Sequence, residues 1–527
     1  MTTFKLRGPV AALLLCLPFA ASAATLDIGI QGEPSSLDAA GVNGAVLDND
    51  VLGDLYEGLV TLGPEGDYRP GVARDWSVSD DGLVWTFELR DNARWSDGEA
   101  VTAEDFVLAF QRVLDPATAS VYANLLYPIR GGAAINAGEA APESLGVRAD
   151  GEHRLVIELA HPTPWLPTLM AHIVASPVPA HLLREYGSDW TDLDHIATNG
   201  AFTPHSWTSH DHLAAVKNPW FHAADGVALD GVNYYPVEDL NSGLARFQSG
   251  ELEIMRDFDA NRLAWLRDHL GDAVHLHNQL ATYYYALNSR PGHPTDDPRV
   301  REALNLALDR DIIANKVLSG AVTATDALVP AGTSGYTSQT MPGLDADRQA
   351  RLARARTLLA AAGYGADNPL RLALRYNARD DHRRIAVAIA AMWRPLGIEV
   401  AMVNAEASVH YAALAEGDFD VARASWVADF DDASNFLGIL TSDSAKNYGD
   451  YDSAEFDALM AESASERDPE ARQALLEQAE RVALGDYALA PIFSDAARNL
   501  VSPTVEGWAD NAINRHLSRW ISLDAAP

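Results

Sequence analysis

The stretch DFDVARASWVADFDD, residues 418–432, decides the fold class. Its first ten residues have the pattern of a short buried strand, and acidic residues follow where that strand ends. The preceding segments alternate between two patterns: a strand at 370–377, a helix at 383–397, a strand at 398–404 and a helix at 409–417. This β-α-β-α-β order favours a mostly parallel sheet with right-handed crossovers. Ligands of such sheets gather at the carboxyl ends of the strands, so the acidic residues stand where a binding site is expected.

The first half of the chain has different patterns. Between residues 83 and 98, aromatic and aliphatic side chains alternate with polar ones, which predicts a half-buried strand. A helix is expected to begin after Thr102, with Asp105 completing a capping box, and to end at Pro116. Further along, residues 296–320 predict one long amphipathic helix that ends at Gly320.

The length and charge of the chain limit the possible functions. A chain of 527 residues is too long for one small core, so two or three lobes or domains are expected. The 39 basic and 74 acidic residues give a formal net charge of −35. A field of that sign repels phosphate backbones, so we expect no nucleic-acid partner.

The N-terminus predicts a secretory signal peptide over residues 1–23. Lys5 and Arg7 precede an apolar run at 10–21, and small residues at 21–23 offer a cleavage site. The alternative is a lipid anchor on Cys16, although the residues around it lack the expected small side chains. Cleavage removes the only cysteine, which excludes disulfides and cysteine-bound metals from the mature chain. No other stretch is long and apolar enough to cross a membrane.

Catalytic and nucleotide-binding motifs are not found. The chain has no G-x-S-x-G, no phosphate-binding glycine loop and no H-E-x-x-H. Two groups of histidines offer a conceivable metal site: His205, His210 and His212, and His269, His275 and His277. Nothing singles out a pair of carboxylates for hydrolysis, although such a pair remains an alternative. We therefore expect no enzymatic activity and no cofactor.

Several segments occur in a characteristic order. They are DGEAVTAEDF at 97–106, TYYYALNSRP at 282–291, DRDIIANKV at 309–317 and FDVARASWVADF at 419–430. In these segments the chain resembles the periplasmic oligopeptide-binding proteins of ATP-binding-cassette importers, a family of extracellular solute-binding proteins. The resemblance covers essentially the whole mature chain.

The resemblance implies a fold and a function. The expected fold is a class II periplasmic-binding-protein clamp of the Venus flytrap type, with an extra small lobe. Lobe I would take 24–57, 184–282 and 500–527; lobe II would take 58–183; and the α/β lobe III would take 283–499. The implied function is capture of oligopeptides in the periplasm and their delivery to an ATP-binding-cassette permease, by a monomer. A receptor for dipeptides or murein peptides is the alternative.

The resemblance also implies how a peptide is held. Asp429 would pair with the free amino terminus, although the alternative is that it only begins a loop or caps a helix. Asp431, Asp432 and Ser434 are better candidates for that cap. The backbone of Ser425 and Val427 would pair with the ligand backbone. Trp426 would line a side-chain pocket, with a core tryptophan as the alternative.

Three tyrosine positions are further candidates. Tyr122 matches a tyrosine that hydrogen-bonds the ligand, and simple packing is its alternative. In a strand, Tyr283 and Tyr285 share one face while Tyr284 points to the other. Since the pattern does not select the face, we take Tyr284 and Tyr285 as one candidate from each.

The carboxyl end of the ligand needs positive charge. Arg423 and His382 match the family positions. The alternatives are an internal salt bridge of Arg423 with Asp420 or Glu416, and an exposed helix-start position for His382.

The chain departs from the family pattern at three other places. Leu414 replaces an expected arginine, Ala407 an expected tryptophan, and Leu318 an expected lysine. These changes leave the preferred peptide length open.

Overall fold

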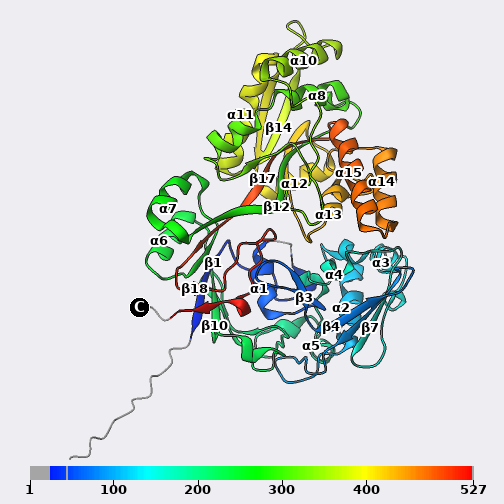
Figure 1. Ribbon diagram of the computed structural model, residues 1–527, viewed down its shortest axis with the longest axis vertical. Coiled ribbons are helices and arrows are strands. Elements are labelled where there is room, and N and C mark those ends of the chain that lie inside the picture. Colours follow the sequence, from blue (N-terminus) through cyan, green and yellow to red (C-terminus); the bar gives the residue numbers. More distant parts are fainter. Residues whose placement is uncertain (1–23, 43–45, 525–527) are drawn as a thin grey trace, which may run out of the picture.

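The computed structural model describes residues 24–42 and 46–524, and one large mixed sheet runs through it (Figure 1). The strand order of this sheet is β15-β14-β16-β12-β17-β11-β1-β10-β9-β8, with the short β13 (Thr323–Ala324) beside β17. The predicted signal peptide at 1–23 lies outside the described residues. We call residues 288–488 the upper part, and residues 24–42, 46–273 and 502–524 the lower part.

The upper part contains the predicted β-α-β-α-β unit. Its elements are β14 (Arg371–Asn377), α11 (Asp380–Trp393), β15 (Glu399–Ala405), α12 (Ala407–Glu416) and β16 (Val421–Val427). β14 pairs in parallel with both β15 and β16, so the expectation of a parallel arrangement is confirmed. The carboxyl ends of β14 and β16 therefore meet at one edge, and that edge faces the lower part (Figure 1).

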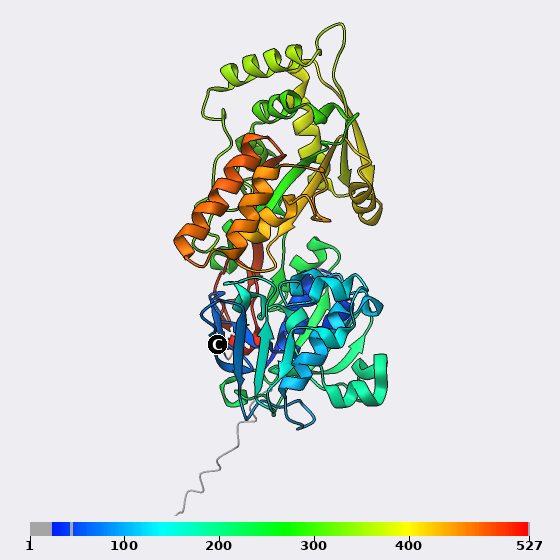
Figure 2. The same cartoon turned by 90° about the vertical axis from the view of Figure 1, so that its right-hand side faces the viewer.

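Two long strands connect the parts. β12 (Val274–Leu287) and β17 (Leu489–Val501) are antiparallel neighbours and belong to the sheet in both parts. β12 pairs with β16 in the upper part, while β17 pairs with β11 in the lower part. Figures 1 and 2 show the two parts stacked along the long axis with these strands passing between them. The lobe boundaries predicted near 282 and 499 both fall inside these continuous strands.

The lower part contains the other half of the large sheet. Its strands are β1 (Thr25–Ile30), β8 (Phe202–Thr208), β9 (His212–Lys217), β10 (Gly231–Pro236) and β11 (Ile254–Arg256). Two helices cover it near the connecting strands, α6 (Leu240–Gln248) and α7 (Leu263–Leu270). Their apolar sides pack with Met255, Phe258 and Leu500 into one buried cluster.

A separate four-stranded sheet lies in the lower part. It is formed by β4 (Ala73–Val78), β5 (Val84–Leu89), β7 (Arg154–Glu158) and β6 (Val147–Ala149), next to α2 (Ala103–Leu114). The predicted capping box is confirmed, because Thr102 and Asp105 bond to each other's backbone N–H groups. The predicted end of this helix before Pro116 is confirmed as well.

The helix predicted over 296–320 is interrupted. α8 (Pro298–Ala307) ends at Leu308, and Asp309 then caps the short α9 (Arg310–Ile312), which continues as a π-helical turn at 313–317. The local cap of Asp309 to the N–H of Ile312 competes with a continuous helix, which the periodicity alone does not show.

The remaining elements complete the two parts. Those of the upper part are α10 (Arg348–Ala361), α13 (Ala433–Leu437), α14 (Ala454–Ser465) and α15 (Pro469–Gly485). Those of the lower part are α1 (Val46–Leu55), α3 (Gly132–Asn136), α4 (Leu166–Leu169), α5 (Ala180–Tyr186), β2 (Val60–Leu62), β3 (Tyr68–Pro70), β18 (Val505–Glu506) and β19 (Ser522–Leu523). Within the described residues, no helix is long and apolar enough to cross a membrane.

Candidate functional site

The loop after β16 holds Asp429 in place through one amide side chain. Asn435 Oδ1 accepts hydrogen bonds from Trp426 Nε1 at 2.8 Å and from the backbone N–H of Asp429 at 3.2 Å. Asn435 lies in α13, whose N-cap is Asp432. The prediction that a neighbour of Asp429 caps this helix is confirmed, and the carboxylate of Asp429 is left for another role.

Asp429 is half-buried, and its carboxylate has no salt bridge within the described residues. Burial raises its pKa from 3.8 to about 6, although Arg515 and a hydrogen bond from Asn435 act in the opposite direction. Among the described residues, no cationic group forms an ion pair with it within 4 Å. A half-buried carboxylate in this state is stabilised by any cation that reaches it.

Tyr122, in the lower part, is within electrostatic range of this carboxylate. Burial raises the pKa of the Tyr122 phenol, and the negative charge of Asp429 raises it further. The ring centre of Tyr122 is 4.8 Å from that of His172. Two neighbours of Asp429 also cross to the lower part: Phe430 packs into its core, and the N–H of Asp431 donates to Tyr68 Oη.

The backbone of β16 is open on one edge. β14 pairs with β16 only at Val421 and Ala422. On the other edge, the N–H of Ala428 donates to the carbonyl oxygen of Leu280 in β12. In an antiparallel strand the backbone N–H and C=O groups of every second residue point to the same edge. The backbone groups of Ser425 and Val427 therefore point away from β12, toward an edge without a strand partner among the described residues.

Arg423 lies at the other end of this open edge. Its side chain is only 8% exposed and donates to Tyr411 Oη at 2.8 Å, Ser425 Oγ at 3.0 Å and Asn377 Oδ1 at 3.4 Å. The guanidinium stacks 4.7 Å from the ring centre of Tyr283, and Nε has no hydrogen-bond partner.

The alternative of an internal salt bridge for Arg423 is wrong. Asp420 instead contacts His293 at 2.9 Å, and its other oxygen accepts from the N–H of Ala373. Glu416 is exposed at the end of α12 and forms no ion pair with Arg423 within the described residues. Arg423 is thus a buried cation whose hydrogen-bond partners are all neutral.

His382 lies in the first turn of α11, close to Arg423 of β16. It is 3% exposed, so the alternative of an exposed histidine is wrong. Burial lowers its pKa to about 3, and the charge of Arg423 adds to this effect. His382 is therefore neutral near pH 7 and supplies no positive charge there. A direct role of His382 in ligand binding stays a prediction.

The three consecutive tyrosines alternate as expected. Tyr283 and Tyr285 pack on the side of α11, and Tyr284 packs on the opposite side of the sheet. Tyr284 and Tyr285 are 3% and 1% exposed, and their roles in binding stay predictions. Tyr283 is the one that lines a cavity, and alternation alone did not distinguish it from Tyr285.

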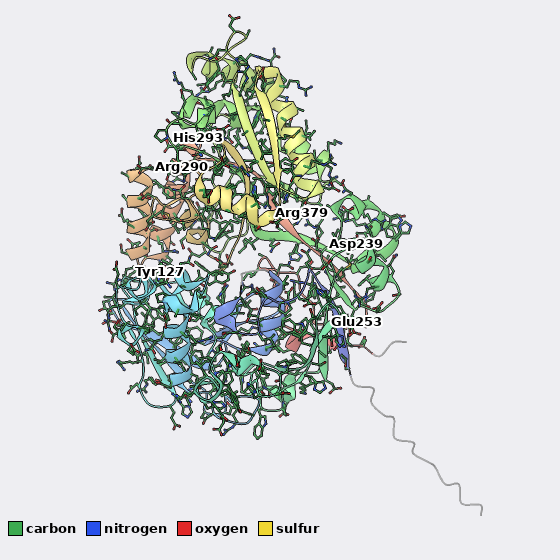
Figure 3. All side chains as sticks on the ribbon, turned by 180° about the vertical axis from the view of Figure 1, so that it is seen from behind. Tyr127, Asp239, Glu253, Arg290, His293 and Arg379 are labelled. Carbon is green, nitrogen blue, oxygen red and sulfur yellow. The ribbon has the colours of Figure 1, made fainter. Side chains whose placement is uncertain are left out.

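A cavity of about 490 Å³ opens beside Arg423. The upper part contributes the start of α11 (379–385), the lower part contributes the loop 257–261, and Leu318 and Phe493 form apolar wall. Figure 3 shows Arg379 at this junction, facing the helix that begins after Asp239. The cavity is enclosed by both parts, so it depends on their relative position.

A second cavity of about 420 Å³ adjoins the first. It shares Asp257, Arg379, Asp495 and Arg498 with the larger cavity and reaches Val427 at the end of β16. The two cavities are thus continuous through these four residues, and β16 contributes Arg423 to the first and Val427 to the second.

The departures from the family pattern differ in their surroundings. Leu414 is fully buried in the core behind β16, so it does not line the cleft. Ala407 is exposed at the first position of α12. Leu318 forms part of the cavity wall. Only Leu318 therefore changes the chemistry of the larger cavity directly.

The conceivable histidine metal sites are not formed. Within the parts of the chain that the structure describes, no group of three or more metal-ligating side chains has suitable geometry. His275 and His277 instead both contact Asp510, at 2.9 and 3.3 Å.

Comparison with known proteins gives concordant results. Residues 67–448 match the bacterial extracellular solute-binding proteins, family 5. The periplasmic murein peptide-binding protein MppA of Escherichia coli is 36% identical over 485 residues, covering 92% of this chain and 90% of the relative. Its solved structure superimposes with a TM-score of 0.85 at 35% identity, covering 95% of this chain and 99% of that one.

Two further relatives from Escherichia coli are equally similar. The periplasmic oligopeptide-binding protein OppA is 35% identical, covering 92% of this chain and 90% of the relative. The probable deoxycholate-binding periplasmic protein YgiS is 36% identical, with coverages of 91% and 89%. The resemblance and the α/β fold class predicted from the sequence are confirmed.

Proposed function

Because the chain belongs to the bacterial extracellular solute-binding proteins of family 5, we propose that it is a periplasmic receptor for oligopeptides. It captures peptides and delivers them to the membrane permease of an ATP-binding-cassette importer, without chemical change of the ligand. The observation that carries this proposal is the open edge of β16, with the half-buried acid Asp429 at one end and the buried cation Arg423 at the other.

An extended peptide has the right chemistry for this edge. Its backbone can pair with Ser425 and Val427, and its two charged ends need opposite charges when they leave water. Asp429 and Arg423 are six residues apart, so they are at most about 20 Å apart along an extended chain. Such a span, shortened by the reach of both side chains, suits a peptide of a few residues.

Closure of the clamp would proceed about the two connecting strands. In this proposal lobes I and II form the lower part, lobe III forms the upper part, and β12 and β17 act as the hinge. The cavity beside Arg423 combines residues of the two parts, and the loop that carries Asp429 contacts the lower part through Asp431 and Tyr68. Opening the hinge would therefore dismantle both ends of the site.

Murein peptides are the second candidate, since the murein peptide-binding protein is as similar to this chain as the oligopeptide-binding one. Such peptides also carry a free amine and carboxylates. A bile acid like deoxycholate fits less well, because it has no amine to pair with the carboxylate of Asp429.

The test is binding by the full mature protein after its co-purifying ligand has been removed. Mass spectrometry first identifies the ligand that leaves the protein purified from its own host. Calorimetry then measures free tri- to pentapeptides, their N-acetylated forms and deoxycholate. We expect binding of free peptides, strong loss on N-acetylation and no cleavage products. Peptide turnover, or binding of deoxycholate alone, would overturn the proposal.

Size measurement in solution and cell fractionation test the remaining expectations. A monomer in the periplasmic fraction is expected for a receptor that presents one closed clamp to its permease.

A further inference from the structure

The larger cavity beside β16 carries more charge than one peptide terminus requires. Five arginine and five aspartate side chains line it. A single terminal carboxylate at Arg423 would use one of the cations. Whether the other cations are already paired decides what else the cavity can bind.

The acids on the lower side are already engaged. Asp257 and Asp495 both contact Arg498, at 2.7 and 3.5 Å. Asp259 caps a short 3-10 turn and accepts from the backbone N–H of Asn261 at 3.0 Å and from its side-chain amide at 2.9 Å. These carboxylates hold the loop between the strand β11 and α7.

Two arginines at the start of α11 are engaged as well. Arg379 contacts Asp381 at 2.8 Å, and Arg383 contacts Asp380 at 3.6 Å. Their charges are offset by carboxylates of the same helical turn, so neither is a strong site for a further anion.

Arg384 is different. Its Nη1 donates to Asn261 Oδ1 at 2.5 Å, and its buried Nε has no hydrogen-bond partner. Within the described residues, neither Arg384 nor Arg423 has a carboxylate within 4 Å. The cavity therefore holds two guanidinium groups whose partners are all neutral.

The two guanidinium groups lie on different sides of the cavity. His382 packs against the ring of Tyr283, and the guanidinium of Arg423 stacks on the same ring. Arg384 is two positions further along α11, and side chains at this spacing do not face each other on a helix. It reaches instead toward Asn261 of the lower part. One small carboxylate is thus poorly suited to satisfy both.

We propose that the receptor prefers peptides whose C-terminal residue carries a second carboxylate, such as glutamate. The α-carboxylate pairs with Arg423, and the side-chain carboxylate pairs with Arg384. This inference rests on the proposed function and names the ligand class of the same site. With both carboxylates bound, each guanidinium gains an ionic partner, and a charge-assisted hydrogen bond is stronger than the neutral ones present.

The experiment compares two peptides that differ only in the last residue, one ending in Glu and one in Gln. Calorimetry measures both with wild-type protein, Arg384→Gln and Arg383→Gln. Wild type should bind the Glu peptide about tenfold more tightly, since coupling of close charge pairs has at least this size. Arg384→Gln should bring the ratio close to one while its affinity for the Gln peptide stays within about twofold.

Arg383→Gln is the matched control, because its charge is on the neighbouring residue but already paired. It should keep the preference for Glu. Equal affinity of wild type for both peptides would overturn this inference and leave the proposed function intact. A loss of both affinities in Arg384→Gln would show that Arg384 only joins the two parts through Asn261. If neither peptide binds, the proposed function fails together with the inference.

Discussion

The two ends of β16 hold opposite charges in different surroundings. At one end, Asp429 is a single acid fixed by Asn435 in a tight loop that contacts the lower part. At the other end, Arg423 opens into a cavity of about 490 Å³ with further cations. The first arrangement suits one small cation in one position, while the second leaves room for ligand ends of different length and chemistry. A ligand would therefore be aligned from its amino end.

The largest effect is expected at the acidic end. Asp429→Asn should reduce affinity for free peptides by about 2–5 kcal/mol, roughly 30- to 5,000-fold, because the ammonium group of the ligand loses the carboxylate with which it is proposed to pair. N-acetylation of the peptide should have a similar effect on wild type. Calorimetry measures both changes. Asp431→Asn is the control: its carboxylate accepts from the N–H of Ser334, and its loss should change affinity little. Unchanged binding by Asp429→Asn would remove the contrast between the two ends.

The cationic end should be less sensitive. Arg423→Met is expected to weaken binding of free-acid peptides by about 1.5–3 kcal/mol, since one charged hydrogen-bonded pair is lost. The cavity leaves space for the carboxylate to keep its water. A C-terminal amide on the peptide should mimic this variant. Because the wild-type guanidinium is buried without a counter-charge, thermal unfolding of the unliganded variant should show equal or higher stability. A larger loss at Arg423 than at Asp429 would reverse the comparison.

The pH dependence of affinity should distinguish the two ends of β16, because Asp429 and His382 titrate in different pH ranges. The pKa of Asp429 is about 6 in the unliganded protein, and only its charged form pairs with an ammonium group. Affinity should thus fall by about tenfold from pH 7 to pH 5, and Asp429→Asn should lose this dependence. His382, with a pKa of about 3, does not titrate in this window.

The stability of the unliganded protein should change with pH in the opposite direction. The folded-state pKa of Asp429 is raised above its usual 3.8, so the stability linked to its protonation is present below about pH 4. It is lost as the pH rises through about 6. Denaturant unfolding at several pH values, with Asp429→Asn as the reference, measures this contribution.

The smallest effect is expected between the two ends, where we propose that the backbone of β16 pairs with the ligand. Val427→Pro removes an N–H that points to the open edge and not to β12, so it should cost about 0.5–1.5 kcal/mol of affinity. Val427→Ala keeps the N–H and should bind within about twofold of wild type. If the alanine variant is the weaker one, the side chain and not the backbone contacts the ligand.

The local elements follow from the sequence because their signals are local. The β-α-β-α-β order, the capping box at Thr102 and Asp105 and the helix cap at Asp432 depend on periodicity and on residues within a few positions. The alternation of Tyr283 and Tyr285 against Tyr284 has the same origin. The position of Asp429 at the carboxyl end of a strand also belongs to this class.

Other properties depend on packing between distant segments. The open edge of β16 exists because β14 pairs only at its start, which no local pattern shows. The neutral state of His382 comes from its burial against Tyr283 and beside Arg423, and the core position of Leu414 from the packing behind β16. The pairing of Arg384 with Asn261, which are 123 positions apart, is of the same kind.

The sequence by itself thus determined the family, the α/β class and the strand that carries the candidate site. Only the tertiary structure decided which tyrosine lines the larger cavity, which of its arginines lack a carboxylate partner and which residues of the two parts line it together. The physical reason is that periodicity and capping are set by neighbours along the chain, whereas burial, pKa and charge pairing are set by neighbours in space.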